Sequence, residues 1–257
     1  MPLNRNQIQA IENTIKESIR KKFRSYTPET SHMPFHYRLL GRDRMALFSF
    51  IHSLNTTFGT SVFEPVAEAV AGSHFLFAKK QYVVGDSISA KAQAEIQAIM
   101  NDLTQGKDTD KAEEIERIRS VCNKGTLNKM KTVKVDLLVA DHDGSFHLFD
   151  LKTAKPNISN FKDFKRTLLE WVAIFLATNP NAKVSSYIAI PYNPYEPKPY
   201  ERWTVKGMLD LSCELKVAEE FWDFLGKNHT YEELLGCFER AGIDLRGEID
   251  QYFQKFK

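Results

Sequence analysis

Two neighbouring apolar segments of the chain carry acidic and basic side chains that are suited to hydrolytic chemistry. Asp136 lies within the apolar run VDLLV, and Asp150 and Lys152 lie in and directly after the run LFDL. A carboxylate inside a sheet is costly unless a partner or a metal ion neutralises it. Because side chains alternate between the two faces of a strand, Asp150 and Lys152 are expected to point the same way.

The turn between the two segments decides whether Asp136 joins them on that face. A two-residue loop, 143–144, would turn Asp136 to the opposite face. A three-residue loop, 142–144, sets Asp136 directly opposite Asp150. This longer loop needs a left-handed residue at its end, and Gly144 adopts that conformation without steric cost. We therefore expect the three-residue loop; a β-bulge nearer the site would shift this register.

The two opposed carboxylates predict a cation between them. Facing carboxylates repel, and each is hard to keep ionised without compensating charge. Mg²⁺ typically takes one or two carboxylates together with water and substrate phosphate. A bound cation lowers the pKa of its water and stabilises charge on phosphorus oxygens. Lys152 is placed to hold or help deprotonate that water and to offset developing negative charge. The three residues therefore indicate Mg²⁺-dependent phosphodiester hydrolysis.

The acid-x-Lys pattern is weak evidence by itself, because three further pairs in the chain share it: Asp163/Lys165, Glu196/Lys198 and Glu214/Lys216. Asp163 and Glu214 fall in helical patterns, where residues two apart do not share a face. Glu196 lies among prolines. The alternative for Asp150 is an exposed hairpin with ordinary surface charges, and the apolar flanks of both segments argue against it.

The composition is that of an ordinary soluble globular protein. The chain has 257 residues, 42% of them hydrophobic and 26% charged, which is enough to bury a substantial core. Its longest apolar run, WVAIFLA, is far too short to span a membrane. The segment MPLNRNQIQ has no signal-peptide core. Three cysteines without a CxxC pair predict a reducing, cytoplasmic location.

The net charge of +2 combines a basic body with a more acidic end, which permits nucleic-acid binding.

Hydrophobic periodicity gives the order of the elements that must position these residues. The patterns predict helices at 8–23, 44–55, 61–71, about 87–103, 111–122 and 161–178, strands at 75–84 and 183–190 besides the hairpin, and two or three C-terminal helices. Gly59 is expected to break the helical pattern before residue 61. This order predicts an α/β fold: a small mixed central sheet flanked by helices, with N- and C-terminal helical additions.

The hairpin residues resemble the signature of the PD-(D/E)XK nuclease superfamily: Asp136, then Asp150-Leu151-Lys152, then a helix and a strand. Val135 stands where that signature often has proline, a position that varies in the superfamily. The stretch MPFHYRLLGRDRMALFSFIHSLNTTFGTSVFEPVAEAVA, with VDLLV and FDLKTAKPN, is similar to the TdeIII-type family of type II restriction endonucleases. This likeness covers most of the chain.

The resemblance implies a PD-(D/E)XK restriction-endonuclease-like core and a homodimeric, Mg²⁺-dependent enzyme. Such an enzyme cuts double-stranded DNA at a short palindromic site, loosely of the GG/CC type, beside a methyltransferase that protects host DNA. We expect a single endonuclease domain with three parts: a mainly helical part at 1–122, a catalytic core at 123–209 and a helical part at 210–257.

Carried over residue by residue, the resemblance makes Asp136 and Asp150 metal ligands and Lys152 the catalytic lysine. Members of the superfamily often add an acid from an early helix, and Glu64 is the first choice for this third ligand. Glu68, one turn further on, is the substitute. The alternative for Glu64 is a helix-capping box, because Ser61-x-x-Glu64 has the required spacing.

Basic residues flank the hairpin on both sides and are the candidates for DNA contacts. The candidates are Lys129, Lys131, Lys134, Lys155, Asn157 and Lys162, with Lys124, Lys165 and Arg166 in the same two clusters. Lysines near a phosphodiester site neutralise backbone phosphates, so binding should weaken with salt. The alternative is that each run of lysines is only a solvated face. The aromatic loop 192–203 either reaches a DNA groove or packs on itself.

Three other functions remain open from the residues alone. A repair or junction nuclease could share the same core. A DNA-binding or regulatory module could keep the fold without catalysis, but such copies often lose one of the acids or the lysine, and all three are present here. A structural interaction protein would leave the opposed acids unexplained.

Overall fold

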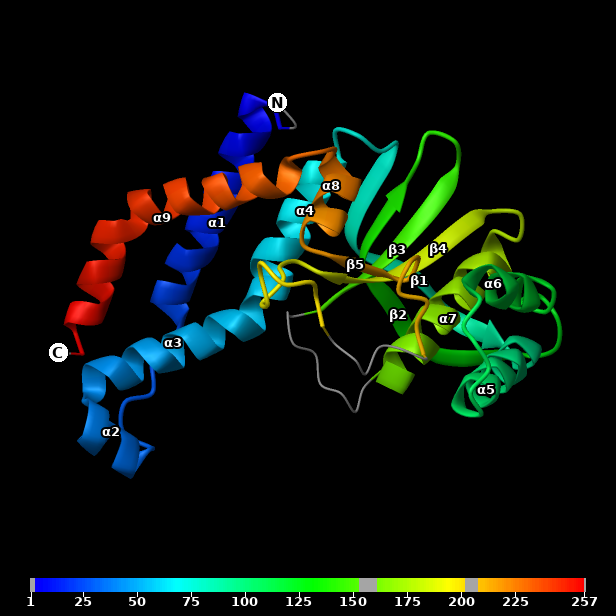
Figure 1. Cartoon of the computed structure of the whole chain (residues 1–257), viewed down its shortest axis with the longest axis horizontal. Helices are drawn as coiled ribbons and strands as arrows, with labels where there is room; N and C mark the ends of the chain where they lie inside the picture. The colour runs from blue at the N-terminus through cyan, green and yellow to red at the C-terminus, as the bar shows by residue number, and fades with distance from the viewer. Residues whose placement is uncertain (1–2, 153–160, 202–207, 257) are drawn as a thin grey trace.

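The computed structural model describes residues 3–152, 161–201 and 208–256. Its elements in chain order are α1 (Arg5–Ser25), α2 (Pro34–Leu40), α3 (Arg42–Phe58), the π-helical turn η1 (Gly59–Phe63), α4 (Glu64–Ala71), β1 (Phe77–Ser89), α5 (Ala90–Thr104), α6 (Lys111–Arg119), β2 (Leu127–Ala140), β3 (Ser145–Leu151), α7 (Phe161–Thr178), β4 (Lys183–Ile190), β5 (Leu215–Val217), α8 (Glu219–Gly226) and α9 (Thr230–Gln254) (Figure 1).

A five-stranded mixed sheet forms the centre of the fold, with its strands in chain order β1-β2-β3-β4-β5. The first three strands pair antiparallel, and β3, β4 and β5 pair parallel. Parallel neighbours need a crossover, and α7 makes the connection between β3 and β4. The predicted α/β fold with a small mixed sheet and terminal helices is confirmed.

Helices cover both faces of the sheet and bury two apolar clusters (Figure 1). On one face α5, α6 and α7 enclose residues such as Leu168 and Val172, here named the α7 layer. On the other face α1, α4, α8 and α9 enclose residues such as Val66 and Trp222, here named the α4 layer. Fully burying one such side chain is worth about 1.5–3 kcal/mol, so the two layers together hold the sheet in place.

At Asp136 the regular alternation of β2 side chains between the two faces of the sheet is interrupted. Val135 packs in the α7 layer, whereas Leu137, two residues on, packs in the α4 layer. Strict alternation would put both on one face. The change occurs opposite Gln81 of β1, whose φ of 49° is left-handed. The β1–β2 ribbon therefore rolls over at Gln81 and Asp136, which lie between the two layers.

Several element boundaries differ from the prediction, and three of the differences change how the elements connect. β1 runs on to Ser89, and the Ser89 side chain, accepting from the backbone N–H of Ala92, caps α5; the helix begins later than expected. β2 begins at Leu127, so much of the basic segment before the hairpin is strand. Gly59 does not break the chain direction, because α3 passes through the π-helical turn into α4. At the two strand boundaries, backbone pairing between β1 and β2 outweighed the local signals.

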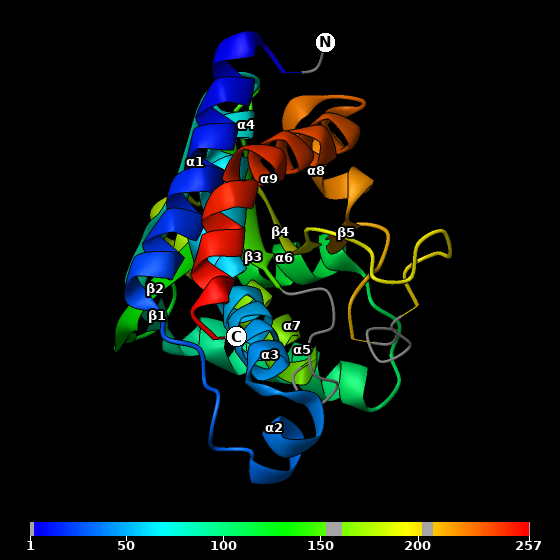
Figure 2. The same cartoon turned by 90° about the vertical axis from the view of Figure 1, so that its left-hand side faces the viewer.

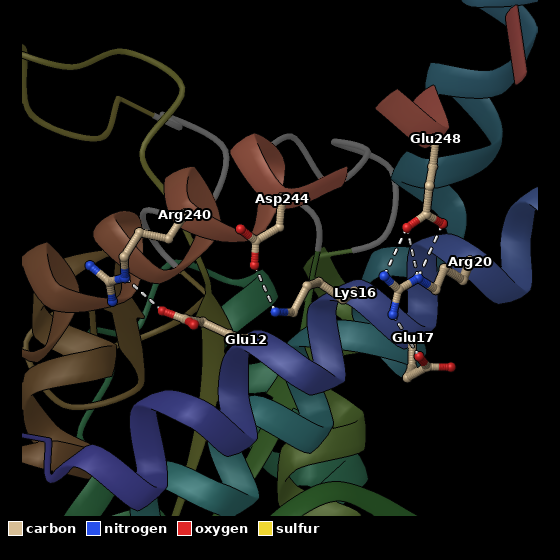
Figure 3. Close-up of polar contacts among 7 residues, drawn as sticks. All are labelled: Glu12, Lys16, Glu17, Arg20, Arg240, Asp244 and Glu248. Atoms are coloured by element: carbon tan, nitrogen blue, oxygen red, sulfur yellow. Dashed lines mark hydrogen bonds and ion pairs between the residues drawn. The ribbon is translucent and has the colours of Figure 1, made fainter. Parts of the chain in front are cut away.

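Helices α1 and α9 lie side by side and, with α2 and α3, extend away from the sheet (Figures 1 and 2). Three ion pairs link α1 to α9, and they advance by four residues along both helices: Glu12–Arg240, Lys16–Asp244 and Arg20–Glu248 (Figure 3). An aromatic cluster ties α3 to the far end of this pair: Phe23, Phe50, Tyr252 and Phe253. Within the described ranges, no helix has the length and apolar character to cross a membrane.

Candidate active site

The turn between β2 and β3 sets the register of the site. The backbone N–H of Asp141 donates to the Ser145 carbonyl at 2.8 Å, and the N–H of Gly144 donates to the Asp141 carbonyl at 3.1 Å. Gly144 is left-handed, with φ of 84°. The loop is therefore the three residues 142–144, as predicted.

Asp136 and Asp150 meet where β2 and β3 begin to separate. The paired residues end with Leu137 opposite Phe149, and the same register places Asp136 opposite Asp150. Beyond this point a side chain takes the place of the backbone hydrogen bonds between the strands: Oδ2 of Asp136 accepts from the backbone N–H of Leu151 at 2.8 Å. The predicted facing of the two carboxyl groups is confirmed.

Lys152 shares the face of Asp150, as strand alternation predicted. Its Nζ lies 2.6 Å from Oδ1 of Asp150 and 5.1 Å from the ring centre of Phe164 in α7. Its backbone N–H donates to the Ala189 carbonyl of β4 at 2.8 Å. The Lys152 side chain is 30% exposed, so its ammonium group lies beside a buried carboxylate and still reaches solvent.

The environment of Asp150 makes its negative charge costly. Asp150 is only 4% exposed. Burial raises the pKa of Asp150 to about 6; the ammonium group of Lys152 lowers it, and the neighbouring Asp136 raises it. Burial thus outweighs the attraction of one lysine. A second positive charge at this point would favour the ionised form.

Glu64 comes to the same place from the α4 layer. It is buried, and its Oε2 accepts from Nε2 of Gln81 at 2.9 Å. Burial raises the pKa of Glu64, the Gln81 bond lowers it and Asp136 raises it. The alternative of a capping box is wrong: the Ser61 hydroxyl donates to the Thr57 carbonyl at 2.6 Å, inside a continuous helical path.

Glu68, the substitute candidate, is engaged elsewhere. Its Oε1 accepts from the backbone N–H of Lys80 at 3.0 Å, and its Oε2 lies 3.6 Å from the Lys80 ammonium group. Glu64 is therefore the helix-borne acid that the fold brings near Asp136.

Gln81 is part of this cluster, although its sequence context carries no signal for it. It lies opposite Asp136, between the pairs Lys80–Leu137 and Tyr82–Val135. Its Nε2 is 2.9 Å from Glu64 and 3.4 Å from Oδ1 of Asp136. A glutamine in a polar strand is unremarkable by type and spacing, and only the left-handed backbone aims its amide at both acids.

The donor set fits a divalent cation in part. Among the described residues, no three His, Cys, Asp or Glu side chains form a group that could hold a metal ion. The acids contact nitrogen donors of the protein: the Lys152 ammonium group contacts Asp150, and the Gln81 amide lies between Glu64 and Asp136. The facing carboxylates of Asp136 and Asp150 match the one or two that Mg²⁺ usually takes, the remaining positions being filled by water and phosphate.

The candidate DNA-binding residues that the structure describes are exposed. Lys129, Lys131 and Lys134 lie along β2 on the approach to Asp136, and Lys162 lies in the first turn of α7. Lys155 and Asn157 lie outside the described residues, as does the end of the loop 192–203.

The expectation for Lys165 is wrong. Its side chain is completely buried, with Nζ 2.6 Å from Glu114 Oε2 and 2.7 Å from Glu214 Oε2. Lys111 adds a second cation 2.6 Å from Glu214 Oε1. Lys165 is on the inner side of α7 and cannot touch DNA. Arg166 bonds to Gln97 of α5 at 2.7 Å.

Comparison with known proteins gives a consistent result. A family model described as type II restriction endonuclease, HinfI, matches residues 3–242. Type II restriction enzyme HgiCII of Herpetosiphon aurantiacus is 29% identical, over 84% of this chain and 80% of the relative. HgiEI of the same organism is 28% identical over 97% of both chains. MjaII of Methanocaldococcus jannaschii, also a type II restriction enzyme, is 28% identical over 97% of this chain and 74% of the relative.

Proposed function

Because the chain belongs to the HinfI family of type II restriction endonucleases, we propose that Asp136, Asp150 and Lys152 form its catalytic site. The enzyme is a site-specific deoxyribonuclease, as the sequence analysis predicted, and the matching family model carries the name HinfI where the residues suggested TdeIII-type enzymes. The proposed reaction is hydrolysis of phosphodiester bonds at a short palindromic site in double-stranded DNA. The observation that supports this site is the 2.6 Å contact of Lys152 with buried Asp150, opposite Asp136.

Each residue has a separate role in this proposal. Enzymes of this class generally use divalent metal ions, and we propose Mg²⁺. Asp136 and Asp150 would hold the cation, with Glu64 as the third acid. When bound, the cation would lower the pKa of the attacking water and stabilise charge on the phosphate. Lys152 holds the water and offsets negative charge on the phosphate oxygens, because its ammonium group is beside Asp150 and reaches solvent.

The proposed DNA surface follows from exposure and position. Lys129, Lys131, Lys134 and Lys162 would contact backbone phosphates beside the site, since all four are exposed. Lys155 and Asn157 are proposed from the sequence alone, because they follow Lys152 by three and five residues.

We further propose a homodimer, because one catalytic site per chain must serve both strands of a palindrome. The surface of α2 and α3 supports a second copy: Phe35, Leu39 and Phe48 are 85%, 82% and 56% exposed. Helix α2 buries no residue of its own. A seven-residue helix is not stable alone, so a partner on its apolar face would complete its packing.

The remaining parts of the proposal concern setting and extent. We propose cytoplasmic action beside a cognate DNA methyltransferase that makes no direct contact; the three free cysteines suit a reducing compartment. We propose that 1–257 is one endonuclease domain, because β1 of the first part and β5 of the last part belong to the same sheet as the catalytic hairpin.

The test is cleavage of unmethylated plasmid DNA by the purified protein, with Mg²⁺ and with EDTA. Discrete bands with Mg²⁺ alone are expected. A smear would instead indicate a nonspecific nuclease, and binding without cutting an inactive module. Asp150→Asn and Lys152→Ala should each lower the cleavage rate by about 10²–10⁴-fold while the protein stays folded.

The control is Lys183→Ala, because Lys183 is an exposed lysine paired with Ser145, at the end of the sheet opposite Asp150 and Lys152. This variant should cut at the wild-type rate. Near-normal cleavage by Asp150→Asn or Lys152→Ala would show that the site is misplaced.

A further inference from the structure

Gln81 holds a backbone conformation that a glutamine rarely adopts. Its φ is 49°, and of the four non-glycine residues with positive φ in the described ranges it is the one inside a strand. The other three, Ala218, Lys227 and His229, flank α8 and α9. Strained backbone persists only where the surroundings enforce it, and it concentrates at functional sites.

The strain has a clear consequence for the side chain. Gln81 lies opposite Asp136 in the β1–β2 pairing, and its amide points at two acids from different elements. Its Nε2 is 2.9 Å from Oε2 of Glu64 in α4 and 3.4 Å from Oδ1 of Asp136 in β2. A regular strand would turn this side chain to one face of the ribbon, away from the gap between the layers.

The position between two carboxylates is where positive charge is most needed. Glu64 is 3% exposed, so its carboxylate has little water to compensate it. The nearby Lys80 ammonium group lies 3.6 Å from Glu68. The Gln81 amide N–H groups therefore supply partial positive charge between Glu64 and Asp136.

An amide side chain suits this position because it has both a donor and an acceptor end. The –NH₂ group donates to carboxylates, and rotation of the same amide presents its carbonyl oxygen. Carbonyl oxygens of Asn and Gln are among the ligands that hard divalent cations accept.

We propose that Gln81 belongs to the cation site: its amide lies between Glu64 and Asp136, and its carbonyl oxygen would be a ligand of the divalent cation. This inference rests on the proposed function, since it assumes that Asp136 takes part in cation binding. It adds β1 to the elements that build the site.

The test measures Mn²⁺ binding to the DNA-free protein, by electron paramagnetic resonance of the free ion. Gln81→Met keeps the length of the side chain and removes the amide. It should raise the dissociation constant about 10–100-fold, the usual effect of losing a group of the metal environment. Gln81→Glu should bind at least as tightly as wild type, because a carboxylate oxygen can ligate in place of the amide.

A further variant separates the effect of backbone strain at Gln81 from the effect of cation binding, and a second variant is its control. Gln81→Gly suits the positive φ, so it should unfold at no lower temperature than wild type and yet lose Mn²⁺ affinity as Gln81→Met does. This variant also serves if Gln81→Met fails to fold. Gln251→Met, an exposed glutamine of α9, is the matched control and should bind normally.

The outcomes distinguish this inference from the proposed function. Wild-type or tighter Mn²⁺ binding by Gln81→Met or Gln81→Gly would overturn the role of Gln81. Weak binding by both Gln81→Met and Gln81→Glu would also overturn it, because the amide would then only position its neighbours. Unchanged affinity in Asp136→Asn would defeat the proposed site itself, and the Gln81 inference with it.

Discussion

Two buried acid–lysine contacts in this protein have different consequences at the level of single residues. Asp150 meets one lysine that reaches solvent, and burial still raises its pKa. For Glu214, burial also acts to raise the pKa, but Lys111 and Lys165 together lower it. The first contact leaves a carboxyl group that favours a further cation. In the second contact two lysines compensate the charge of Glu214 inside the fold, away from Asp150, so we regard that network as structural.

The structural network makes a prediction for Lys165. Replacing Lys165 with Met leaves Glu114 buried with no cation in contact, because Lys165 is its ion-pair partner. Breaking a buried ion pair costs about 3–5 kcal/mol, so the free energy of unfolding in urea should fall by that order.

Lys162→Met is the control for this measurement, since Lys162 is an exposed lysine of the same helix. Its effect should stay within about 0.5 kcal/mol. A loss below about 1 kcal/mol in Lys165→Met would mean that water reaches Glu114 or that another cation replaces Lys165.

At the scale of elements, α1 and α9 are joined by a buried apolar face and by a row of ion pairs at its edge (Figure 3). Ile11 and Ile15 of α1 pack with Cys237 and Ala241 of α9 in the α4 layer. Surface ion pairs contribute little each, so apolar packing supplies most of the stability. The ion pairs add a dependence on pH.

Glu248 provides the test of that dependence. Hydrogen bonds from Arg20 lower the pKa of Glu248 below its ordinary value of 4.5. A carboxylate with a lowered folded-state pKa stabilises the fold above the unfolded-state pKa, and this stabilisation is lost as pH falls through the lowered pKa. Wild type should therefore melt above Glu248→Gln at pH 6, and the difference between the two melting temperatures should shrink as the pH falls below 4.5.

Glu239→Gln, a change at an exposed glutamate of the same helix, is the control and should follow wild type at every pH. A constant difference between wild type and Glu248→Gln from pH 6 to pH 3 would contradict the assignment to this ion pair.

At the scale of the whole molecule, the exposed apolar face of α2 and α3 should be an interface between two copies. Phe35→Asp combined with Leu39→Asp places two charges there, and both positions are exposed, so the monomer fold should remain. Sedimentation velocity should show wild type as a dimer and the double variant as a monomer that no longer cuts palindromic DNA.

Ile243→Asp alters an apolar side chain that is 59% exposed on α9, away from α2 and α3, and should leave the dimer intact. A double variant that sediments as a dimer would remove the second copy from this face.

DNA affinity also belongs to the whole molecule, because phosphate contacts add along the surface. In an Asp150→Asn background, which blocks cleavage, Lys129→Ala, Lys131→Ala and Lys134→Ala should each lower the slope of log affinity against log salt by about 1. Lys183→Ala, an exposed lysine at the opposite end of the sheet, should leave the slope unchanged. If the three β2 variants keep the slope of the Asp150→Asn parent, β2 is excluded from the DNA surface.

The site was predictable where its geometry depends on neighbouring residues in the chain. Strand alternation relates Asp150 to Lys152, and the length of a glycine-ended loop relates Asp136 to Asp150. These rules act over at most fifteen residues, so the sequence by itself determined the hairpin and its facing acids. The α/β fold followed in the same way from the order of periodic segments.

Tertiary structure alone decided the contacts between elements. Gln81 meets Glu64 and Asp136 across separations of 17 and 55 residues, through a backbone strain that no local pattern announces. Lys165 is buried because α7 turns that side toward Glu114 and Glu214, which lie 51 and 49 residues away in sequence. Which polar groups meet in the interior depends on how helices and strands pack, and the chain specifies that packing only as a whole.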